Sequence, residues 1–374
     1  MKLTTTAFGT WSGGRYMHFG EQLSEDALGN LMREAYDKGV RTFVTADVYG
    51  TGKADELLGQ ALAGVDRDTY CLVGTVGHDI YDGVRQGSKG YPRFTDPSLR
   101  GPEGYASYLR MATEKSLERC RVSRFDYVFL HNPDWIGYSS PAVWDAMEGL
   151  CDSGLTDMIG VAPGPANGFV MDLIHNFETF GDRIDAAMVI LNPLEPWPQR
   201  HVLPVAERLG IDIMTRVVDY GGVFHGVVQP GHKFRDGDHR SYRPEGWVEH
   251  AHEKVGRFQE IADAHGLTLL QFACQWNLSQ PAVKSVVPTL IQEAGPNAKS
   301  ISQELDELAA VSANIVLTPE EIAEVERLGD NEGCMQLKGA TLRFPSEGVP
   351  LPDQWALRPE LVEIAGRYGL DPAW

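Results

Sequence analysis

The stretch TADVYG at residues 45–50, followed by ADELLG at residues 54–59, decides the fold of this chain. It places the carboxyl of Asp47 and the phenol of Tyr49 two residues apart, after the apolar pair Phe43-Val44 and before a segment with a helical pattern. Side chains two residues apart along a strand point to the same face. A carboxyl and a phenol in one pocket can relay a proton. The stretch therefore predicts a strand that ends at a proton-transfer site.

A strand–helix rhythm extends from this stretch in both directions. Helical periodicity over residues 25–38 puts Leu28, Leu31 and Ala35 on one face, with Ser24 as the N-cap. Alternation of strands and helices predicts a parallel sheet, and eight units is the number that closes a (β/α)8 TIM barrel. The eight predicted strands are Thr4–Thr10, Arg41–Ala46, Tyr70–Val76, Asp126–His131, Asp157–Ala162, Ala186–Leu191, Ile211–Val217 and Lys284–Pro288.

The competing architecture is a doubly wound open sheet, which would carry a G-x-G-x-x-G turn after its first strand. No such turn follows the first predicted strand here. We therefore expect one α/β domain over residues 1–330, a TIM barrel with long loops. Residues 331–374 predict an irregular C-terminal tail packed on the barrel, over its mouth. The residues that suggest irregularity are Gly333, Pro345, Gly348, Pro350 and Pro352.

The charge balance narrows the classes of partner. The 374 residues include 33 Lys and Arg against 52 Asp and Glu, a net charge of −19. So acidic a chain disfavours nucleic acid and anionic membranes as partners. No run of about 18 apolar residues predicts a membrane span. We expect a small-molecule substrate, no nucleic acid and no membrane, while nothing in the sequence sets the oligomeric state.

Cysteine usage and the first residues both bear on the compartment. The five cysteines lie far apart, at positions 71, 120, 151, 274 and 334, and form no C-x-x-C pair. A zinc ribbon or iron–sulfur site is therefore not expected, and no metal is predicted. The start, Met1-Lys2-Leu3-Thr4, lacks a signal-peptide pattern. Reduced thiols then predict a cytoplasmic protein.

Four segments together resemble the aldo-keto reductase superfamily. Residues Phe8-Gly9-Thr10-Trp11 are similar to the end of the family's first strand, and residues 43–59 match its second strand best. Residues 126–134, DYVFLHNPD, resemble its fourth strand, and residues 280–288, QPAVKSVVP, resemble bacterial branches of the family. The resemblance covers most of residues 1–330. It implies a TIM-barrel oxidoreductase that uses a nicotinamide cofactor.

The resemblance also implies roles for single residues. In the family a tyrosine gives a proton to a carbonyl oxygen, a histidine orients the carbonyl, and an aspartate supports the tyrosine. These roles fall on Tyr49, His131 and Asp47, each at the end of a predicted strand. NADP or NAD is the implied cofactor, with NADP slightly favoured. The residues implied to hold it are Gly9, Thr10, Trp11, Asp47, Asn192, Arg216 and Lys299. Arg216 has two open interpretations, stacking on the nicotinamide ring or pairing with a carboxylate.

The chain departs from the family pattern at the third strand. There the family carries a catalytic lysine that pairs with the aspartate and lowers the pKa of the tyrosine. An ungapped match places Thr75 at this position, and a shift of one residue would place Val76 there. Without the cation we expect the Tyr49 pKa to lie nearer that of free tyrosine, about 10. His78, three residues further on, is a candidate substitute.

Two further departures concern the cofactor. After its fifth strand the family has Ser-Asn, whose side chains hold the nicotinamide amide, whereas this chain has Ala162-Pro163. The segment after the eighth predicted strand, residues 289–300, is longer than in the family, and Lys299 is its only basic residue. The sequence therefore leaves open whether a 2′-phosphate binds there.

Three functional hypotheses follow. The first is a nicotinamide-dependent oxidoreductase acting on a small polar carbonyl or hydroxyl compound such as a sugar derivative, with Tyr49 as proton donor or acceptor. The second is a non-redox lyase or isomerase that uses Tyr49 and His131 on the same barrel. The third is a cofactor-sensing binding protein, for which channel-associated relatives of the family set the precedent.

Overall fold

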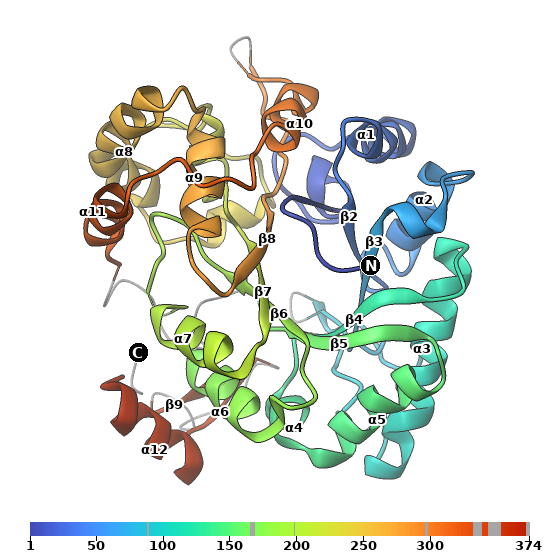
Figure 1. Ribbon diagram of the computed structural model, residues 1–374. Coiled ribbons are helices and arrows are strands. Elements are labelled where there is room, and N and C mark those ends of the chain that lie inside the picture. Colours follow the sequence, from blue (N-terminus) through green and yellow to red (C-terminus); the bar gives the residue numbers. More distant parts are fainter. Residues whose placement is uncertain are drawn as a thin grey trace.

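A computed structural model describes residues 1–87, 90–164, 169–197, 199–295, 298–331, 339–342 and 353–371. Eight parallel strands follow one another in chain order around a barrel, with helices on the outside (Figure 1). A parallel bridge between Thr6 and Val286 joins the last strand to the first. The strands are β1 (Ala7–Gly9), β2 (Thr42–Ala46), β3 (Cys71–Val76), β4 (Phe125–His131), β5 (Thr156–Ala162), β6 (Ala186–Ile190), β7 (Asp212–Arg216) and β8 (Val283–Val287). The predicted TIM barrel is thereby confirmed.

The helices of the barrel follow their strands. They are α1 (Glu25–Asp37), α2 (Lys53–Ala61), α3 (Tyr105–Cys120), α4 (Trp135–Ser139), α5 (Pro141–Asp152), α6 (Val170–Phe180), α7 (Gln199–Leu209), α8 (Trp247–Ala264), α9 (Leu269–Leu278), α10 (Ile301–Ala309) and α11 (Pro319–Gly329). The side chain of Ser24 accepts from the amide of Ala27 and caps α1 as predicted. Within the described residues, no helix is long and apolar enough to cross a membrane.

The first strand is shorter than predicted, because the Thr4 amide donates to the side chain of Thr42 at 2.9 Å instead of joining the ladder. The tail also differs from its prediction. Its described parts contain β9 (Gly339–Thr341), β10 (Gln354–Ala356) and α12 (Pro359–Tyr368), so it is not irregular throughout. Proline at the start of α12 and a left-handed Gly369 after it are ordinary helix boundaries. The residues on which the prediction rested, Gly333, Pro345, Gly348, Pro350 and Pro352, lie outside the described residues.

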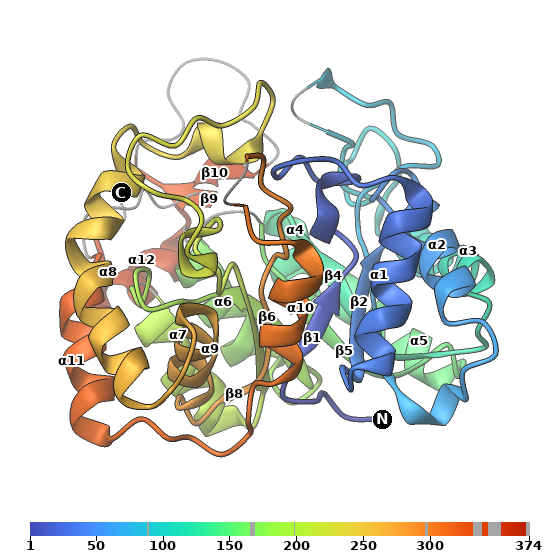
Figure 2. The same cartoon turned by 90° about the horizontal axis from the view of Figure 1, so that it is seen from above.

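Apolar side chains fill the interior of the barrel, which leaves the ends of the barrel for a functional site. The interior holds buried residues from most strands, among them Ala7, Val44, Val73, Phe129 and Met214. Figure 2 shows the loop around residue 85, the loop around residue 230, and β9 with β10 at one end of the molecule, opposite the N-terminus. This is the end where the strands finish, and TIM-barrel enzymes carry their active sites there.

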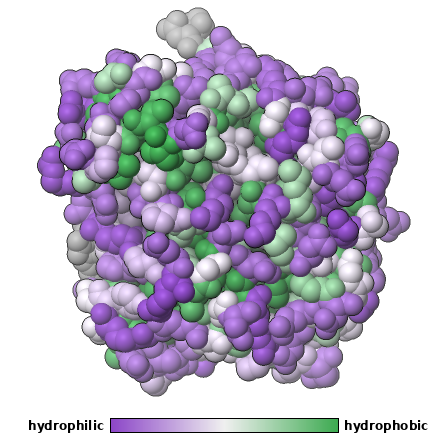
Figure 3. Space-filling view, in the orientation of Figure 1, coloured by the Kyte–Doolittle hydropathy of each residue, from purple (hydrophilic) through white to green (hydrophobic). Residues whose placement is uncertain are grey.

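Hydrophilic residues cover most of the face seen in Figure 3, and apolar residues form separate patches on it, one of them over α8 and α9. This surface agrees with the net charge of −19.

A buried ion cluster holds the long loop between β7 and α8. Arg240 donates to Asp238 at 2.7 and 3.0 Å and also pairs with Glu293 after β8. All three side chains are at most 4 % exposed. Asp238 also accepts from the amide of Gly20 in the loop after β1, at 2.9 Å. One arginine therefore ties together the loops after β1, β7 and β8.

We expect Arg240→Met to lower the free energy of unfolding by about 3–5 kcal/mol, because it leaves two buried carboxylates without their cation. The control is Arg235→Met in the same loop, which breaks an exposed pair with Glu21 and should cost about 0–1 kcal/mol. Urea unfolding followed by circular dichroism measures both. Equal losses would contradict this account of the cluster.

Candidate active site

Residues predicted from three different strands meet at the barrel mouth. Ala46 of β2 pairs with Thr75 of β3, and Thr75 pairs in turn with Phe129 of β4. Asp47 follows β2 directly, and its amide donates to the carbonyl of Thr75 at 3.4 Å. Parallel pairing therefore gathers the ends of β2, β3 and β4 in one place, and the side chains of Asp47, Tyr49, Thr75 and His131 with them.

Thr75, which the ungapped sequence match places at the family's lysine position, contacts the histidine. Its hydroxyl donates to the carbonyl of Thr45 at 3.1 Å and lies 3.3 Å from Nδ1 of His131. A hydroxyl has a single proton, so Nδ1 of His131 is the donor in the second bond. In a neutral imidazole the other nitrogen, Nε2, is then an acceptor. The His131 ring lies edge-on to the ring of Tyr49, with 5.8 Å between centroids.

Asp47 is buried without a cation bonded to it. It is fully buried, and neither carboxylate oxygen has a side-chain hydrogen-bond partner among the described residues. Burial, followed by the nearby charge of Asp55, raises the pKa of Asp47 well above its ordinary value. Arg119 of α3, bonded to Tyr81 at 3.2 Å, only opposes that rise. Burial therefore favours the protonated form of Asp47.

Burial also sets the protonation of the other two groups. It raises the pKa of Tyr49 to about 12, and only the charge of Arg216 opposes the rise. It lowers the pKa of His131 to about 3, helped by the charges of Arg93 and Arg216. At neutral pH the site therefore holds a protonated phenol and a neutral imidazole.

The loop after β3 adds His78, the candidate substitute for the lysine, and Arg93, which the sequence did not indicate. The His78 ring packs edge-on against that of His131, with centroids 5.1 Å apart. Arg93, in the same loop, donates to Nδ1 of His78 at 3.1 Å and to the carbonyl of Asn132. Arg93 lies in a segment without periodicity, and the bridge between His78 and Arg93 is visible only in the structure.

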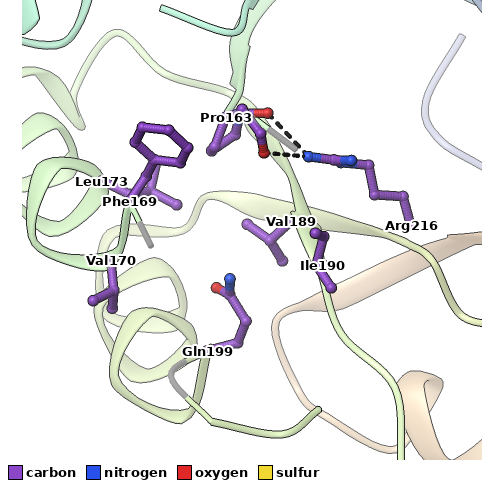
Figure 4. Close-up of a pocket in the computed structure, with 9 residues that line it drawn as sticks. Pro163, Phe169, Val170, Leu173, Val189, Ile190, Gln199 and Arg216 are labelled. Carbon is purple, nitrogen blue, oxygen red and sulfur yellow. Dashed lines mark hydrogen bonds between the residues drawn. The ribbon is translucent and has the colours of Figure 1, made fainter. Parts of the chain in front are cut away.

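Arg216, at the end of β7, faces the turn after β5. Its Nη2 donates to the carbonyl oxygens of Pro163 and Gly164 at 3.1 and 2.5 Å (Figure 4). A small cavity of about 10 Å³ adjoins it, lined by Phe169, Leu173 and other apolar residues. Among the described residues, Arg216 therefore pairs with no carboxylate, and it contacts the turn at Pro163 and Gly164.

Gly9 at the end of β1 and the next two residues, Thr10 and Trp11, differ in their contacts. Trp11 lies edge-on to Tyr49, with centroids 6.2 Å apart, and donates to Thr289 at 3.2 Å. A Cβ atom at Gly9 would lie 2.4 Å from the Trp11 ring, so the indole requires glycine there. The hydroxyl of Thr10 donates to Thr45 at 3.3 Å.

Asn192 and Lys299 have partners of their own. The Asn192 amide nitrogen donates to Glu195 at 2.7 Å and to the carbonyl of Val217 at 3.0 Å, and its oxygen accepts from the Leu194 amide at 2.9 Å. Lys299 pairs with Glu307 at 2.6 Å. Neither side chain joins the group around Tyr49. Among the described residues, no three His, Cys, Asp or Glu side chains could hold a metal ion.

The family model named "Aldo/keto reductase family" matches residues 6–330, nearly the whole chain. The chain belongs to the aldo/keto reductase family. It is accordingly an NAD(P)-dependent, oxidoreductase-like enzyme, as the sequence motifs predicted.

Relatives of this aldo/keto reductase differ in their described roles. An Arabidopsis thaliana protein described as "Probable voltage-gated potassium channel subunit beta" is 25 % identical over 346 residues, 88 % of this chain and 93 % of the relative. The versiconal hemiacetal acetate reductase of Aspergillus parasiticus is 24 % identical over 375 residues, 87 % of this chain and 93 % of the relative.

Solved structures agree on the fold. The glycerol dehydrogenase of Gluconobacter oxydans superposes with a TM-score of 0.67 at 21 % identity, covering 94 % of this chain and 96 % of that one. An aldo/keto reductase of Klebsiella pneumoniae, solved in complex with NADP and acetate, has a TM-score of 0.58 at 22 % identity over the same shares of both chains.

We expect acid to destabilise this reductase through His131. Because its pKa falls from 6.5 to about 3 on folding, the unfolded chain binds a proton between these values that the native state does not. Stability is then lost as pH falls below 6.5, by up to about 1.4 kcal/mol per pH unit. His131→Gln should flatten this slope between pH 6.5 and 4.5 in urea unfolding. His250→Gln, at a histidine 55 % exposed on α8, is the control, and an unchanged slope in His131→Gln would contradict the assignment.

Proposed function

We propose that this aldo/keto reductase is a cytoplasmic enzyme that reduces a small polar carbonyl compound, such as a sugar derivative, with Tyr49 as the proton donor. The observation that carries the proposal is the protonated Tyr49 phenol, with its pKa of about 12, beside His131 at the barrel mouth. Four described cysteines are free thiols, which suits a reducing compartment.

The protonation states favour reduction over oxidation at neutral pH. A phenol whose pKa lies near 12 keeps its proton, so it can give that proton to a carbonyl oxygen. Alcohol oxidation would need the phenolate, which forms only in strong base. Nε2 of His131, an acceptor without a partner among the described residues, suits a hydroxyl on the substrate carbon next to the carbonyl. A substrate with neighbouring carbonyl and hydroxyl groups fits both side chains.

A nicotinamide cofactor, when bound, supplies the hydride for this reduction. The described residues fit such an anionic, extended group. A cavity of about 240 Å³ lies between the loops after β1, β7 and β8. Its lining contains the basic residues His232, Lys233, Arg235 and Arg240 and also the acids Glu21, Asp238 and Glu293, which pair with Arg235 and Arg240. Lys233, a lining cation with no ion pair among the described residues, suits a phosphate, while Trp11 and Arg216 lie beside Tyr49, where the nicotinamide would bind.

Nearby backbone amides already have partners. The Thr289 amide donates to Asp219 and the Ile291 amide to Glu304, each at 2.8 Å. Side-chain cations, and not these amides, would therefore hold the phosphates. We favour NADP as the cofactor, because two reductases of Klebsiella pneumoniae were solved with NADP or NADPH.

The direct test is a purified-enzyme screen. Initial rates of NADPH and NADH oxidation are measured with a panel of hydroxyaldehydes, hydroxyketones and aldose sugars. Turnover that disappears in Tyr49→Phe supports the proposal. Absence of measurable turnover for the whole panel with both cofactors would refute the proposal.

A second candidate function has support in the potassium-channel subunit relative and in the missing lysine. A cofactor-sensing subunit would bind NADPH tightly without turning over substrate. Fluorescence titration with NADPH, together with pull-down of a membrane partner, separates it from an enzyme that passes the screen.

We expect Thr75→Lys to restore the family's cation beside Asp47 and to lower the pKa of Tyr49. A cation within about 4–6 Å of a titratable group moves its pKa by roughly one to three units. The pH at which kcat for alcohol oxidation rises should then move down by that amount. Thr75→Met, similar in length but uncharged, is the control. Identical profiles for the two variants would show that Tyr49 does not respond to charge at this position.

Cofactor preference is testable through Lys299. Its ammonium pairs with Glu307 at 2.6 Å, and a carboxylate there repels a 2′-phosphate. Glu307→Gln should therefore tighten NADPH binding by about two- to fivefold, the range of a partly exposed ion pair, and leave NADH binding unchanged. Fluorescence titration gives both dissociation constants. Equal changes for the two cofactors would remove Lys299 from the phosphate site.

A further inference from the structure

Two guanidinium groups flank His131 without a carboxylate partner. Arg93 and Arg216 both lower the pKa of His131 by their charge, and neither has a described carboxylate oxygen within 4.0 Å. Asp134 and Asp353 act on Arg93, and Glu195 on Arg216, only at longer range. Positive charge is therefore concentrated at the mouth of a barrel whose overall charge is −19.

Nε and Nη1 hold the Arg93 guanidinium in place. Arg93 is 7 % exposed. Its Nε donates to the carbonyl of Asn132, and Nη1 donates to His78 at 3.1 Å and to the Tyr91 carbonyl at 3.4 Å. Nη2 has no partner in the described part of the chain. Asp134 forms no ion pair with it within 4.0 Å, and its oxygens accept from Thr95 and from the Gly137 amide.

Arg216 likewise has a bound nitrogen and other donors without a partner among the described residues. Its Nη2 is bound to Pro163 and Gly164, whereas Nη1 and Nε make no hydrogen bond to the described residues. The carbonyl contacts fix the plane of the guanidinium and leave donors free. Figure 4 shows the side chain extended from β7 toward the turn after β5.

The third group is the phenol of Tyr138 in α4. Its side chain is fully buried, and its hydroxyl has no partner among the described residues. Phe169, which packs against the Tyr138 ring, lines the same small cavity as Gly164 and Arg216. The charges of both Arg93 and Arg216 oppose the rise in the Tyr138 pKa. Phe169 and Trp355 cover its ring, with centroids 6.1 Å from it. Asp172, the acid nearest to it, accepts from the Trp355 indole at 3.0 Å.

We propose that Arg93, Arg216 and Tyr138 form a subsite beside His131 for an oxyanion carried by the substrate, either a carboxylate or a phosphate. The proposal rests on the proposed reduction and adds the substrate class. Burying a cation without a counter-ion is costly, and a hydroxyl buried without a partner adds to that cost. An oxyanion accepts bonds from all three groups and offsets both costs. Arginine is the residue suited to such planar recognition.

Matched substrate pairs test the class. Glyoxylate is compared with glycolaldehyde for the carboxylate, and glyceraldehyde 3-phosphate with glyceraldehyde for the phosphate. We expect kcat/KM of the wild-type enzyme to favour the anionic member of one pair at least tenfold, and the favoured pair identifies the anion. Turnover of the neutral members at equal or higher kcat/KM overturns the subsite while the proposed reduction stands.

Three variants assign the effect to the subsite. Arg93→Met should bring the preference within twofold, Arg93→Lys should keep part of it, and Tyr138→Phe should reduce it several-fold. Arg85→Met, at an exposed arginine of the same loop, should leave it unchanged. Circular dichroism confirms that each variant is folded. If Arg93→Met and Arg85→Met keep the same preference, the subsite is not at Arg93.

A binding measurement separates failure of the subsite from failure of the reduction. Calorimetric titration with malonate and with inorganic phosphate needs no turnover. Binding of either that weakens at least tenfold in Arg93→Met supports the subsite even where no carbonyl compound is reduced. Absence of binding together with absence of an anionic preference overturns it.

Discussion

The parallel register of β2, β3 and β4 is the constraint on which the site depends. Ala46 pairs with Thr75, and Thr75 with Phe129, so the residues just beyond these positions converge at one end of the barrel. The strand register therefore determines which side chains are neighbours at this end of the barrel. When the third strand carries a threonine in place of a lysine, the effect therefore falls directly on Asp47, Tyr49 and His131.

That effect is a change in where positive charge lies. Asp47 has no cation bonded to it among the described residues, and burial raises its pKa well above the ordinary value. The cations near the reacting groups are now arginines supplied by other elements, Arg93 by the loop after β3 and Arg216 by β7. Burial, which the charge of Arg216 opposes, keeps the phenol of Tyr49 protonated.

Much of this was predictable from sequence because it depends on local pattern. Strand alternation and the helix cap at Ser24 indicated the barrel, and the alignment of β3 indicated the threonine. The rest depends on contacts between distant segments. Arg93 lies in an unpatterned loop and meets His131 only through tertiary packing, and Glu307 reaches Lys299 only after α10 has formed. The helix α12 was a different case, since Pro359 and Gly369 mark its ends in the sequence.

The ion cluster at Arg240 has a consequence for the timing of events at the site. Because one guanidinium joins the loop between β7 and α8 to the segment after β8, and Asp238 to the loop after β1, these segments open together or not at all. A cofactor held beneath them would leave at the rate at which that single cluster breaks. Buried pairs are little screened by salt, so its residence time would be nearly independent of ionic strength.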